Sequence, residues 1–301
     1  MKRGKFISAG IACIVAILAL LMEETAMAKT VNRSGSSKSD FAMECINTCK
    51  WTASDIETLQ LKYYFEEILI LPSPNNNIIL KQYLSCNDSK YLDTVSKDGN
   101  AITITQGQRP SNVTYQSKLK LYIPDHYNGT VELDVDEGSI AIRGPLAVKT
   151  MMLNLAEGKI QADKVTVINS LTAHAPDGVV YLTDCTGNIG VEVGSGSVII
   201  NSCNIGGSIK ANDYTAMNIG LSGIYSNLRI SNKEGTVRLG LPGNDSFRIN
   251  AFLTDKDGVL RNNFSDTFTN DGMSINGTWG SNPKKNIIVS SSDAITLEKN
   301  K

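Results

Sequence analysis

A short segment that begins with glycine recurs along the chain, and this repeat constrains the fold more than any other feature. Each copy reads Gly-x-[Ile/Val]-x-[Ile/Leu/Ala], and each glycine follows an acidic residue or a serine. The glycines are Gly138, Gly158, Gly178, Gly196 and Gly235, with gaps of 20, 20, 18 and 39 residues. The last gap is close to two repeats, with a degenerate copy near 216–219. Such a period predicts structural units that stack on one another.

A second alternating segment precedes each of the first three glycines, at 131–135, 151–155 and 171–175. A coil of a β-solenoid cannot bury its inner face unless neighbouring coils stack on it, and two short strands per repeat suit such a coil. We therefore predict an all-β, single-domain β-solenoid, with stacked coils of about 20 residues and two or more short strands per coil.

This register makes specific predictions about side chains. Residues at equal distances from successive glycines should share a column, with neighbours roughly 4.8 Å apart. The predicted interior columns are Leu133, Leu153 and Ala173, and Val135, Leu155 and Ala175; the predicted outward ladder is Asp134, Asn154 and His174. The alternative is a sandwich with evenly spaced hairpins. Turn chemistry and apolar phase recur together, which favours the solenoid because independent hairpins have no reason to keep both in step.

The amino-terminal segment 1–28 predicts export. Three cations within the first five residues precede an uncharged apolar run at 6–22, and small residues stand at the two positions that a signal peptidase reads, in Ala26-Met27-Ala28. Alternatively the run stays as a membrane anchor, since its length is at the lower edge of the roughly 17–25 residues that span a bilayer. The expected location is therefore extracellular or in the cell envelope.

The next segment, 29–52, begins polar and serine-rich, which is typical of a flexible leader. The folded domain is therefore expected over 53–299. Within it, 54–71 is ambiguous between a capped helix and alternating strands, and strands are favoured.

Charge excludes some partners. Without 1–28 the chain has 26 Lys and Arg against 28 Asp and Glu, a net charge of −2. A nucleic-acid partner needs a basic face and an anionic membrane needs a polybasic cluster, and neither is visible in the sequence. We expect no nucleic-acid partner, and membrane contact only through a retained anchor.

The ionisable residues give no catalytic, cofactor or metal site. The two histidines, His126 and His174, have no nucleophile motif beside them. Asp134-x-Asp136 and Asp255-x-Asp257 lack the further acidic ligands that complete a calcium loop, which favours ordinary acidic turns. We expect no cofactor.

Cysteines are odd in number once 1–28 is removed, because five remain, so at least one lacks a partner within the chain. Cys185 and Cys203 each lie seven residues after a repeat glycine, in line with Pro145 and Val165. They are candidates for a disulfide between coils, or for reduced thiols in an apolar column. Cys45 and Cys49 could pair with each other or with Cys86.

Several segments resemble the family of bacterial putative adhesins, exported proteins with β-strand repeats and no established function. The similarity covers about 53 to 299. It is carried by the glycine-led repeats and by the segments 119–124 (LKLYIP), 247–251 before Asp257-Gly258, 286–289 and 294–297. The chain has Ser292-Asp293 where the family has a glycine-led turn. The resemblance implies an architecture and supplies no functional residue.

The resulting hypothesis is a non-enzymatic secreted or envelope protein that adheres, senses or scaffolds. Its expected ligand is an unidentified surface molecule, such as a polysaccharide or an envelope protein. Two alternatives remain open. One is a polysaccharide lyase or hydrolase on a β-helix, which needs carboxylates converging in one groove. The other is a structural envelope protein that assembles through its end coils.

Overall fold

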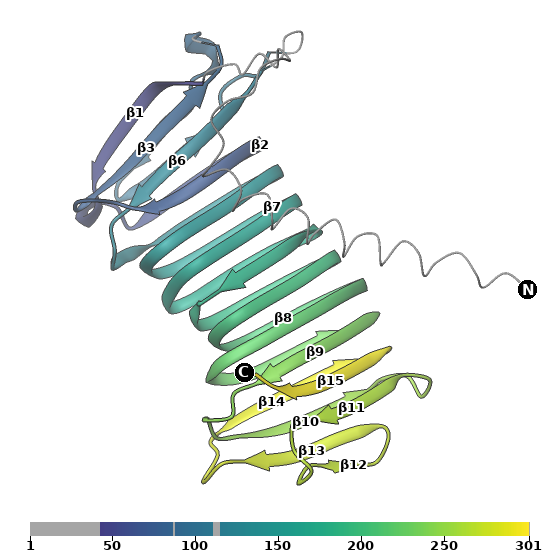
Figure 1. Cartoon of the computed structure of the whole chain (residues 1–301). Coiled ribbons are helices and arrows are strands. Elements are labelled where there is room, and N and C mark those ends of the chain that lie inside the picture. Colours follow the sequence, from purple (N-terminus) through teal and green to yellow (C-terminus); the bar gives the residue numbers. More distant parts are fainter. Residues whose placement is uncertain (1–42, 87, 111–114, 301) are drawn as a thin grey trace, which may run out of the picture. The chain divides into compact units, whose positions relative to one another are not determined.

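A computed structural model describes residues 43–86, 88–110 and 115–300, and this part of the chain is nearly all β (Figure 1). Two short 3-10 turns, η1 (Ala53–Asp55) and η2 (Ser89–Tyr91), are the helical elements described. The strands join into one sheet, which is not closed. They are β1 (Glu44–Thr52), β2 (Thr58–Pro72), β3 (Asn77–Leu84), β4 (Thr94–Asp98), β5 (Ala101–Thr105), β6 (Ser117–Ile123), β7 (Tyr127–Thr183), β8 (Thr186–Asn232), β9 (Gly235–Leu241), β10 (Phe247–Leu253), β11 (Val259–Asn263), β12 (Thr269–Asn270), β13 (Ser274–Trp279), β14 (Lys285–Ser291) and β15 (Ala294–Lys299).

The repeat glycines lie on top of one another. Parallel pairing sets Gly178 opposite Gly196, and a Cβ on Gly158 would lie 2.0 Å from the carbonyl oxygen of Gly138. A Cβ on Gly196 would lie 1.9 Å from the oxygen of Gly178. Glycine recurs at these residues because a Cβ there would meet the backbone of the preceding coil. The parallel register therefore repeats with the periods read from the sequence.

In two further coils, a residue other than glycine occupies the position of the repeat glycine. In β2 it is Glu66, which pairs with Gly138, and in β8 it is Thr215, which pairs with Gly235. Strands are thus confirmed over 58–71, where a helix was the alternative, while 53–55 form the turn η1.

Turns between separate strands were predicted at the glycines. This part of the prediction is wrong, because the chain bends there within a continuous strand. Four of the five glycines have positive φ, between 131° and 137°, and Gly178 does not. The chain keeps its ladder hydrogen bonds through the bend because the coils above and below bend at the same place.

Side-chain burial follows the predicted register. The six predicted interior residues, Leu133, Leu153, Ala173, Val135, Leu155 and Ala175, are all buried in one apolar core. Asp134, Asn154 and His174 are all exposed. Pro145 is an exception, since it is exposed and Leu146 is buried in its place. The column prediction was wrong there because Leu146 lies eight residues after its glycine and Val165 only seven.

Strand β1 corrects one boundary. It lies inside the predicted leader 29–52 and pairs antiparallel with β3, from Glu44 opposite Leu84 to Thr52 opposite Asn77. Its weak apolar alternation gave no strand signal, because β1 is an edge strand held mainly by backbone hydrogen bonds. The predicted signal segment 1–28 and residues 29–42 lie outside the described part.

Each end of the coil series carries additional strands. At one end β1, β3 and β6 run beside β2, with β5 and β4 on a side branch (Figure 1). At the other end β14 and β15 pair parallel with β8 and β9, and β10, β13 and β12 follow β14. The predicted strands 119–123, 247–251, 286–289 and 294–297 are all present. In the described ranges no helix is long and apolar enough to span a bilayer.

Candidate functional site

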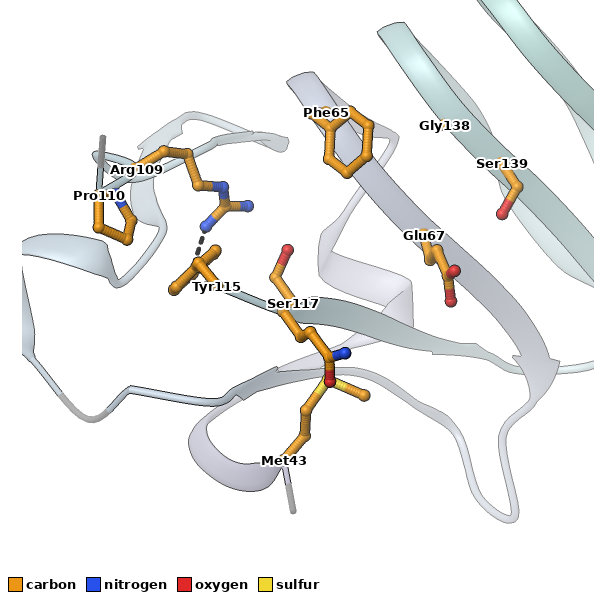
Figure 2. A pocket seen from close by; sticks show the side chains of 10 residues that line it. Met43, Phe65, Glu67, Arg109, Pro110, Tyr115, Ser117, Gly138 and Ser139 are labelled. Atoms are coloured by element: carbon orange, nitrogen blue, oxygen red, sulfur yellow. Dashed lines mark hydrogen bonds between the residues drawn. The ribbon is translucent and has the colours of Figure 1, made fainter. Parts of the chain in front are cut away.

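An open cavity of about 750 Å³ lies where β2, β6 and β7 meet the segment after β5 (Figure 2). Strand β2 contributes Phe65 and Glu67, and the start of β7's first bend contributes Gly138 and Ser139. The remaining lining residues are Met43, Arg109, Pro110, Tyr115, Gln116 and Ser117. The lining thus combines one guanidinium, one carboxylate, two hydroxyl groups of serine and two aromatic rings.

Arg109 is the central polar group of this cavity. Its Nη2 donates to Glu66 Oε2 at 2.5 Å and its Nη1 donates to the Tyr115 hydroxyl at 2.7 Å. Its Nε is buried and has no hydrogen-bond partner among the described residues. Each Nη group of a guanidinium carries two N–H groups, so Nη1 and Nη2 of Arg109 each keep one donor for an incoming carboxylate, phosphate or hydroxyl.

Glu66 lies beneath Arg109 and does not itself line the cavity, since its side chain is 1% exposed. Burial raises the pKa of its carboxyl group to about 7, although the Arg109 guanidinium and a hydrogen bond with Ser117 act in the opposite direction. The backbone N–H of Glu67 also donates to it at 3.3 Å. Glu66 therefore fixes the guanidinium from below while staying out of reach of a ligand.

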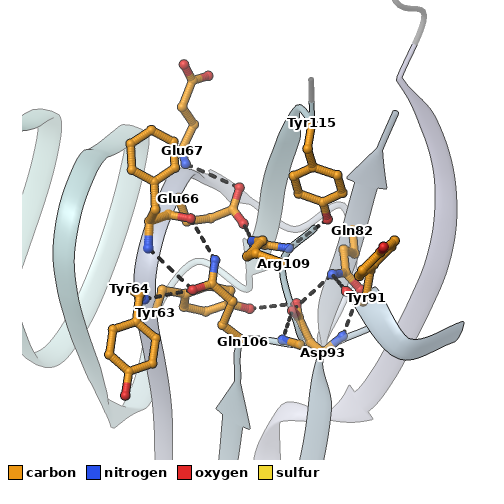
Figure 3. A network of polar contacts seen from close by, with 12 residues as sticks. Tyr63, Tyr64, Glu66, Glu67, Gln82, Tyr91, Asp93, Gln106, Arg109 and Tyr115 are labelled. Atoms are coloured by element: carbon orange, nitrogen blue, oxygen red, sulfur yellow. Dashed lines mark hydrogen bonds and ion pairs between the residues drawn. The ribbon is translucent and has the colours of Figure 1, made fainter. Parts of the chain in front are cut away.

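A second buried group continues this network (Figure 3). Asp93 accepts hydrogen bonds from the Tyr63 hydroxyl at 2.7 Å and from Gln82 Nε2 at 2.9 Å, and its own N–H donates to Gln82 Oε1. Burial raises the pKa of Asp93, and burial followed by the charge of Asp93 raises the pKa of Tyr63. These groups satisfy one another, which makes the network a rigid support for the cavity.

Gln106 connects the same support to β2. Its Oε1 accepts from the backbone N–H of Tyr64 at 2.8 Å, and its Nε2 donates to the carbonyl of Phe65 at 2.7 Å. These bonds hold the bend in β2 that turns the aromatic rings of Tyr64 and Phe65 outward, where both are largely exposed.

This arrangement is suited to binding. A hydrolase or lyase needs ionisable groups that touch the substrate, and the two carboxyl groups with raised pKa values here are buried and already hydrogen-bonded. Glu67 is the one carboxylate in the lining. The cavity can therefore accept a polar group without offering it a pair of catalytic acids.

A second cavity, of about 790 Å³, lies between the start of β2 and the turn before β7. It contains His126, which has a φ of 62° and whose Nε2 lies 3.5 Å from Asp125 Oδ2. Asp125 also accepts a hydrogen bond from the backbone N–H of Ala147. Both side chains are at least half exposed, and their contacts are those of a turn.

The other ionisable residues singled out in the sequence stay apart. His174 is in an exposed contact with Glu192, 3.8 Å away on the next coil. Asp134 and Asp136 are exposed on β7, and Asp255 accepts from the N–H of Asp257 in a surface turn. Among the described residues, no three acidic, histidine or cysteine side chains are grouped closely enough to hold a metal ion.

The structure brings Cys185 and Cys203 together. Both are buried free thiols, and the Cys185 N–H donates to Cys203 Sγ at 3.3 Å. A side-chain hydrogen bond with Cys185 and then burial raise the pKa of the Cys203 thiol, although the backbone N–H bond acts in the opposite direction. A disulfide between these coils stays a prediction.

Cys45 and Cys49 lie on either side of a bulge in β1. Cys45 is opposite the partly exposed Tyr83, whereas Cys49 is opposite the buried Leu80, so the two thiols face opposite sides of the sheet. Both are free, as is the exposed Cys86. Their pairing also stays a prediction, and a Cys45–Cys49 bridge would require β1 to rearrange.

Sequence reasoning missed Arg109, Glu66 and Asp93. One signal was available in Tyr63-Tyr64-Phe65-Glu66-Glu67, where a charged residue takes the glycine position and the strand alternation breaks. Nothing in the local sequence around Arg109 or Asp93 indicates that they approach β2.

Comparison with known proteins gives one family and several structures. Residues 56–298 match the family model described as Toastrack DUF4097. A crystal structure of a putative cell adhesion protein from Clostridium sporogenes is 14% identical, covers 84% of this chain and 98% of its own, and has a TM-score of 0.29. A putative adhesin from Bacteroides fragilis is 10% identical, with coverage of 84% and 96% and a TM-score of 0.43.

A putative adhesin from Parabacteroides distasonis is similar to the same degree, at 10% identity, coverage of 83% and 96%, and a TM-score of 0.43. No curated protein matches the chain. At these identities and TM-scores, the likenesses do not bear on what this chain binds.

Proposed function

We propose, from the premise that the chain belongs to the Toastrack DUF4097 family, that it is a non-enzymatic module that binds a molecule of the cell surface or its surroundings. In this proposal 53–299, together with β1, act as a single β-solenoid domain. The protein is exported and works outside the cell or in the envelope, by adhesion, sensing or scaffolding.

The observation that carries this proposal is the repeated parallel register. Because Gly138, Gly158, Gly178 and Gly196 stack, the side chains that follow and precede them form straight rows across neighbouring coils. Rows with a spacing of roughly 4.8 Å suit an extended polymer, which repeats along its own length. A rigid scaffold of this kind also needs little ordering when it binds.

The cavity around Arg109 provides the anchoring contact in this proposal. The guanidinium is held by Glu66 and Tyr115 and keeps free donors, so it can receive one anionic or hydroxyl group of the ligand without rearranging. The binding interpretation is favoured over the lyase or hydrolase because the carboxyl groups of this site are buried and engaged.

The experiment is a binding screen of the purified protein against immobilised cell-wall polymers and glycans, with product analysis of each polymer after prolonged incubation. We expect retention of at least one polymer and no shortening of any. Release of oligosaccharides that is lost when Asp134 or Asp136 is replaced would overturn the non-enzymatic proposal. Retention of no polymer would overturn the binding proposal.

Variants of Arg109 test whether the cavity takes part in binding. Arg109→Gln should weaken binding of the retained polymer by about tenfold, because a charge-assisted hydrogen bond is lost. Arg261→Gln is the matched control, since Arg261 is exposed on β11 and lies outside the cavity. The double variant E66Q/R109Q avoids leaving Glu66 unpaired. Unchanged affinity in both Arg109 variants would remove the cavity from the proposal.

A further inference from the structure

Cationic side chains from five strand segments meet on one face of the sheet, although they are spread between residues 50 and 159 of the sequence. We name this the basic face. It consists of the outward side chains of β1, β3 and β6, of the second half of β2, and of the residues that follow the first three repeat glycines in β7. Its cations are Lys50, Lys81, Lys118, Lys120, Arg143 and Lys159, and its tyrosines are Tyr83, Tyr122 and Tyr181.

The strand register puts these residues side by side, because β1, β3, β6, β2 and β7 follow one another across the sheet (Figure 1). Lys120 of β6 lies between Lys81 of β3 and Leu69 of β2, and Leu69 in turn lies beside Ala141 of β7. The side chains between them in sequence, such as Leu119 and Leu121, are fully buried. The cations therefore all point away from the core, on the same side of a continuous sheet.

Lys81 and Lys120 are directly opposite each other on antiparallel strands. Like charges in this position destabilise a strand pair. Each ammonium instead lies over a tyrosine of the other strand, with Lys81 Nζ 5.5 Å from the Tyr122 ring centroid and Lys120 Nζ 4.8 Å from that of Tyr83. Neither lysine has a carboxylate within 4.0 Å in the part of the chain that the structure describes. The repulsion between these two lysines is therefore not neutralised by a neighbouring carboxylate.

The acidic residues of the face do not balance its cations. Six cations stand against two acids, Glu67 and Asp163, which leaves an excess of four positive charges. The one ion pair described within the face is long, with Lys118 Nζ 3.8 Å from Glu67 Oε2. This excess is local, because the chain as a whole has a formal net charge of −1.

We infer that the basic face binds an acidic polysaccharide laid across the strands, with carboxylate groups on the lysines and sugar hydroxyls on the tyrosine hydroxyls. The inference rests on the proposed function and names its ligand class. The face borders the cavity around Arg109, since Glu67 and Ser139 of the cavity stand at one end of its rows. A chain on the face can therefore place one carboxylate on the free donors of Arg109.

Two other polyanions fit the face less well. A membrane surface is usually contacted by protruding apolar side chains as well as by cations, and the exposed large apolar side chains beside this face, Met43 and Phe65, line the cavity at its end. Single-stranded nucleic acid stacks its bases on open aromatic rings, whereas Tyr83 and Tyr122 each have an ammonium group over the ring. Acidic polysaccharides need neither feature.

The test compares four immobilised probes: polygalacturonate, neutral dextran of similar length, single-stranded DNA, and vesicles of phosphatidylserine with phosphatidylcholine. We expect the purified protein to bind polygalacturonate more tightly than the other three. Raising the salt concentration from about 50 to about 200 mM should weaken this binding, because exposed charges are screened. Equal binding to dextran, or tighter binding to DNA or vesicles, would overturn the inference.

The variant K81Q/K120Q should bind polygalacturonate about tenfold more weakly, since two exposed charge contacts are lost. The control K97Q/K256Q makes the same change of charge at two exposed lysines in β4 and in the turn before β11, and should bind like the wild type. Circular dichroism establishes that both variants are folded. An equal loss in both pairs, or no loss in K81Q/K120Q, contradicts the inference while leaving the proposed binding function intact.

Discussion

The basic face and the face before the glycine bend lie on the same coils and carry opposite charges. We call the second one the acidic face. It consists of the outward side chains of the first half of β2 and of those that precede the first four repeat glycines in β7 and β8, and its one cation, Lys62, lies opposite Asp134. Its acids are Glu132, Asp134, Asp136 and Glu192, and the bend itself adds Glu137, Glu157 and Asp177.

Because the two faces carry opposite charges, the net charge of the chain does not indicate the charge of either face. A strand that passes through Gly138 leaves acidic side chains on one side of the bend and contributes Arg143 to the other. The second coil repeats this division with Glu157 at its bend and Lys159 after it, and β3 and β6 add five more residues of the basic face. The two faces should accordingly differ in the ligands that they accept.

The largest effect is expected from a substitution at the glycine bend, which lies between the two faces. Gly158→Ala introduces a Cβ 2.0 Å from the Gly138 carbonyl oxygen, at a φ of 132° that side chains rarely adopt. We expect a loss of about 3 kcal/mol in the free energy of unfolding, measured by urea denaturation. Gly243→Ala is the control, because a Cβ there meets nothing within 4 Å. Similar stability of the two variants would mean that the coils are not in this register.

The second largest effect is a pH dependence of the free energy of unfolding. It arises in β2, the strand on which the two faces meet. Because the pKa of Glu66 is raised from 4.5 to about 7, the folded protein keeps a proton that the unfolded chain loses. The contribution of Glu66 to the free energy of unfolding should be highest below pH 4.5 and fall as the pH rises to about 7, by about 3 kcal/mol in total. Denaturation across this range measures it.

Glu66→Gln is the variant that sharpens this prediction. The amide does not titrate, so most of the decline between pH 4.5 and 7 should disappear, and Asp93 should leave a smaller slope of the same sign because its pKa is raised too. Glu67→Gln changes the exposed neighbour and should keep the wild-type pH dependence. A wild-type profile that rises over this range would show that Glu66 is ionised in the folded protein.

The smallest effect compares the faces directly. Asp134→Asn with Asp136→Asn removes two charges from the acidic face without touching the core, since both residues are exposed. Binding of polygalacturonate should strengthen by about twofold, because long-range repulsion between exposed charges is weak and screened. Titration at low salt measures this. A clear weakening of binding would place the polymer on the acidic face instead.

Much of the coil architecture was predictable because it depends on short-range patterns. Glycine spacing and strand alternation are local properties, and they placed Leu153 inside and Asn154 outside correctly. The prediction was wrong at β1, whose pairing with β3 leaves little apolar signal, and at Pro145, where one coil is a residue longer before its next buried side chain. In both places the outcome depends on a neighbour distant in sequence.

The candidate site was less predictable for the same reason. Arg109 reaches Glu66 across 43 residues, and Asp93 meets Tyr63 across 30. The six cations of the basic face come from five separate strand segments, so the sequence shows no basic cluster, and the expectation of no nucleic-acid partner did not include this surface. The DNA probe in the binding test addresses this directly.

The amino-acid sequence by itself determined that the chain is all β, that it repeats about every 20 residues, and which side of each repeating strand is apolar. These properties follow from the period of a strand and from the need for glycine where backbones touch. Only the tertiary structure decided that Glu66 lies beneath Arg109 and that lysines from β1, β3, β6 and β7 share one surface. Strand order across the sheet brings those charges together, and strand order depends on long-range pairing that no local pattern encodes.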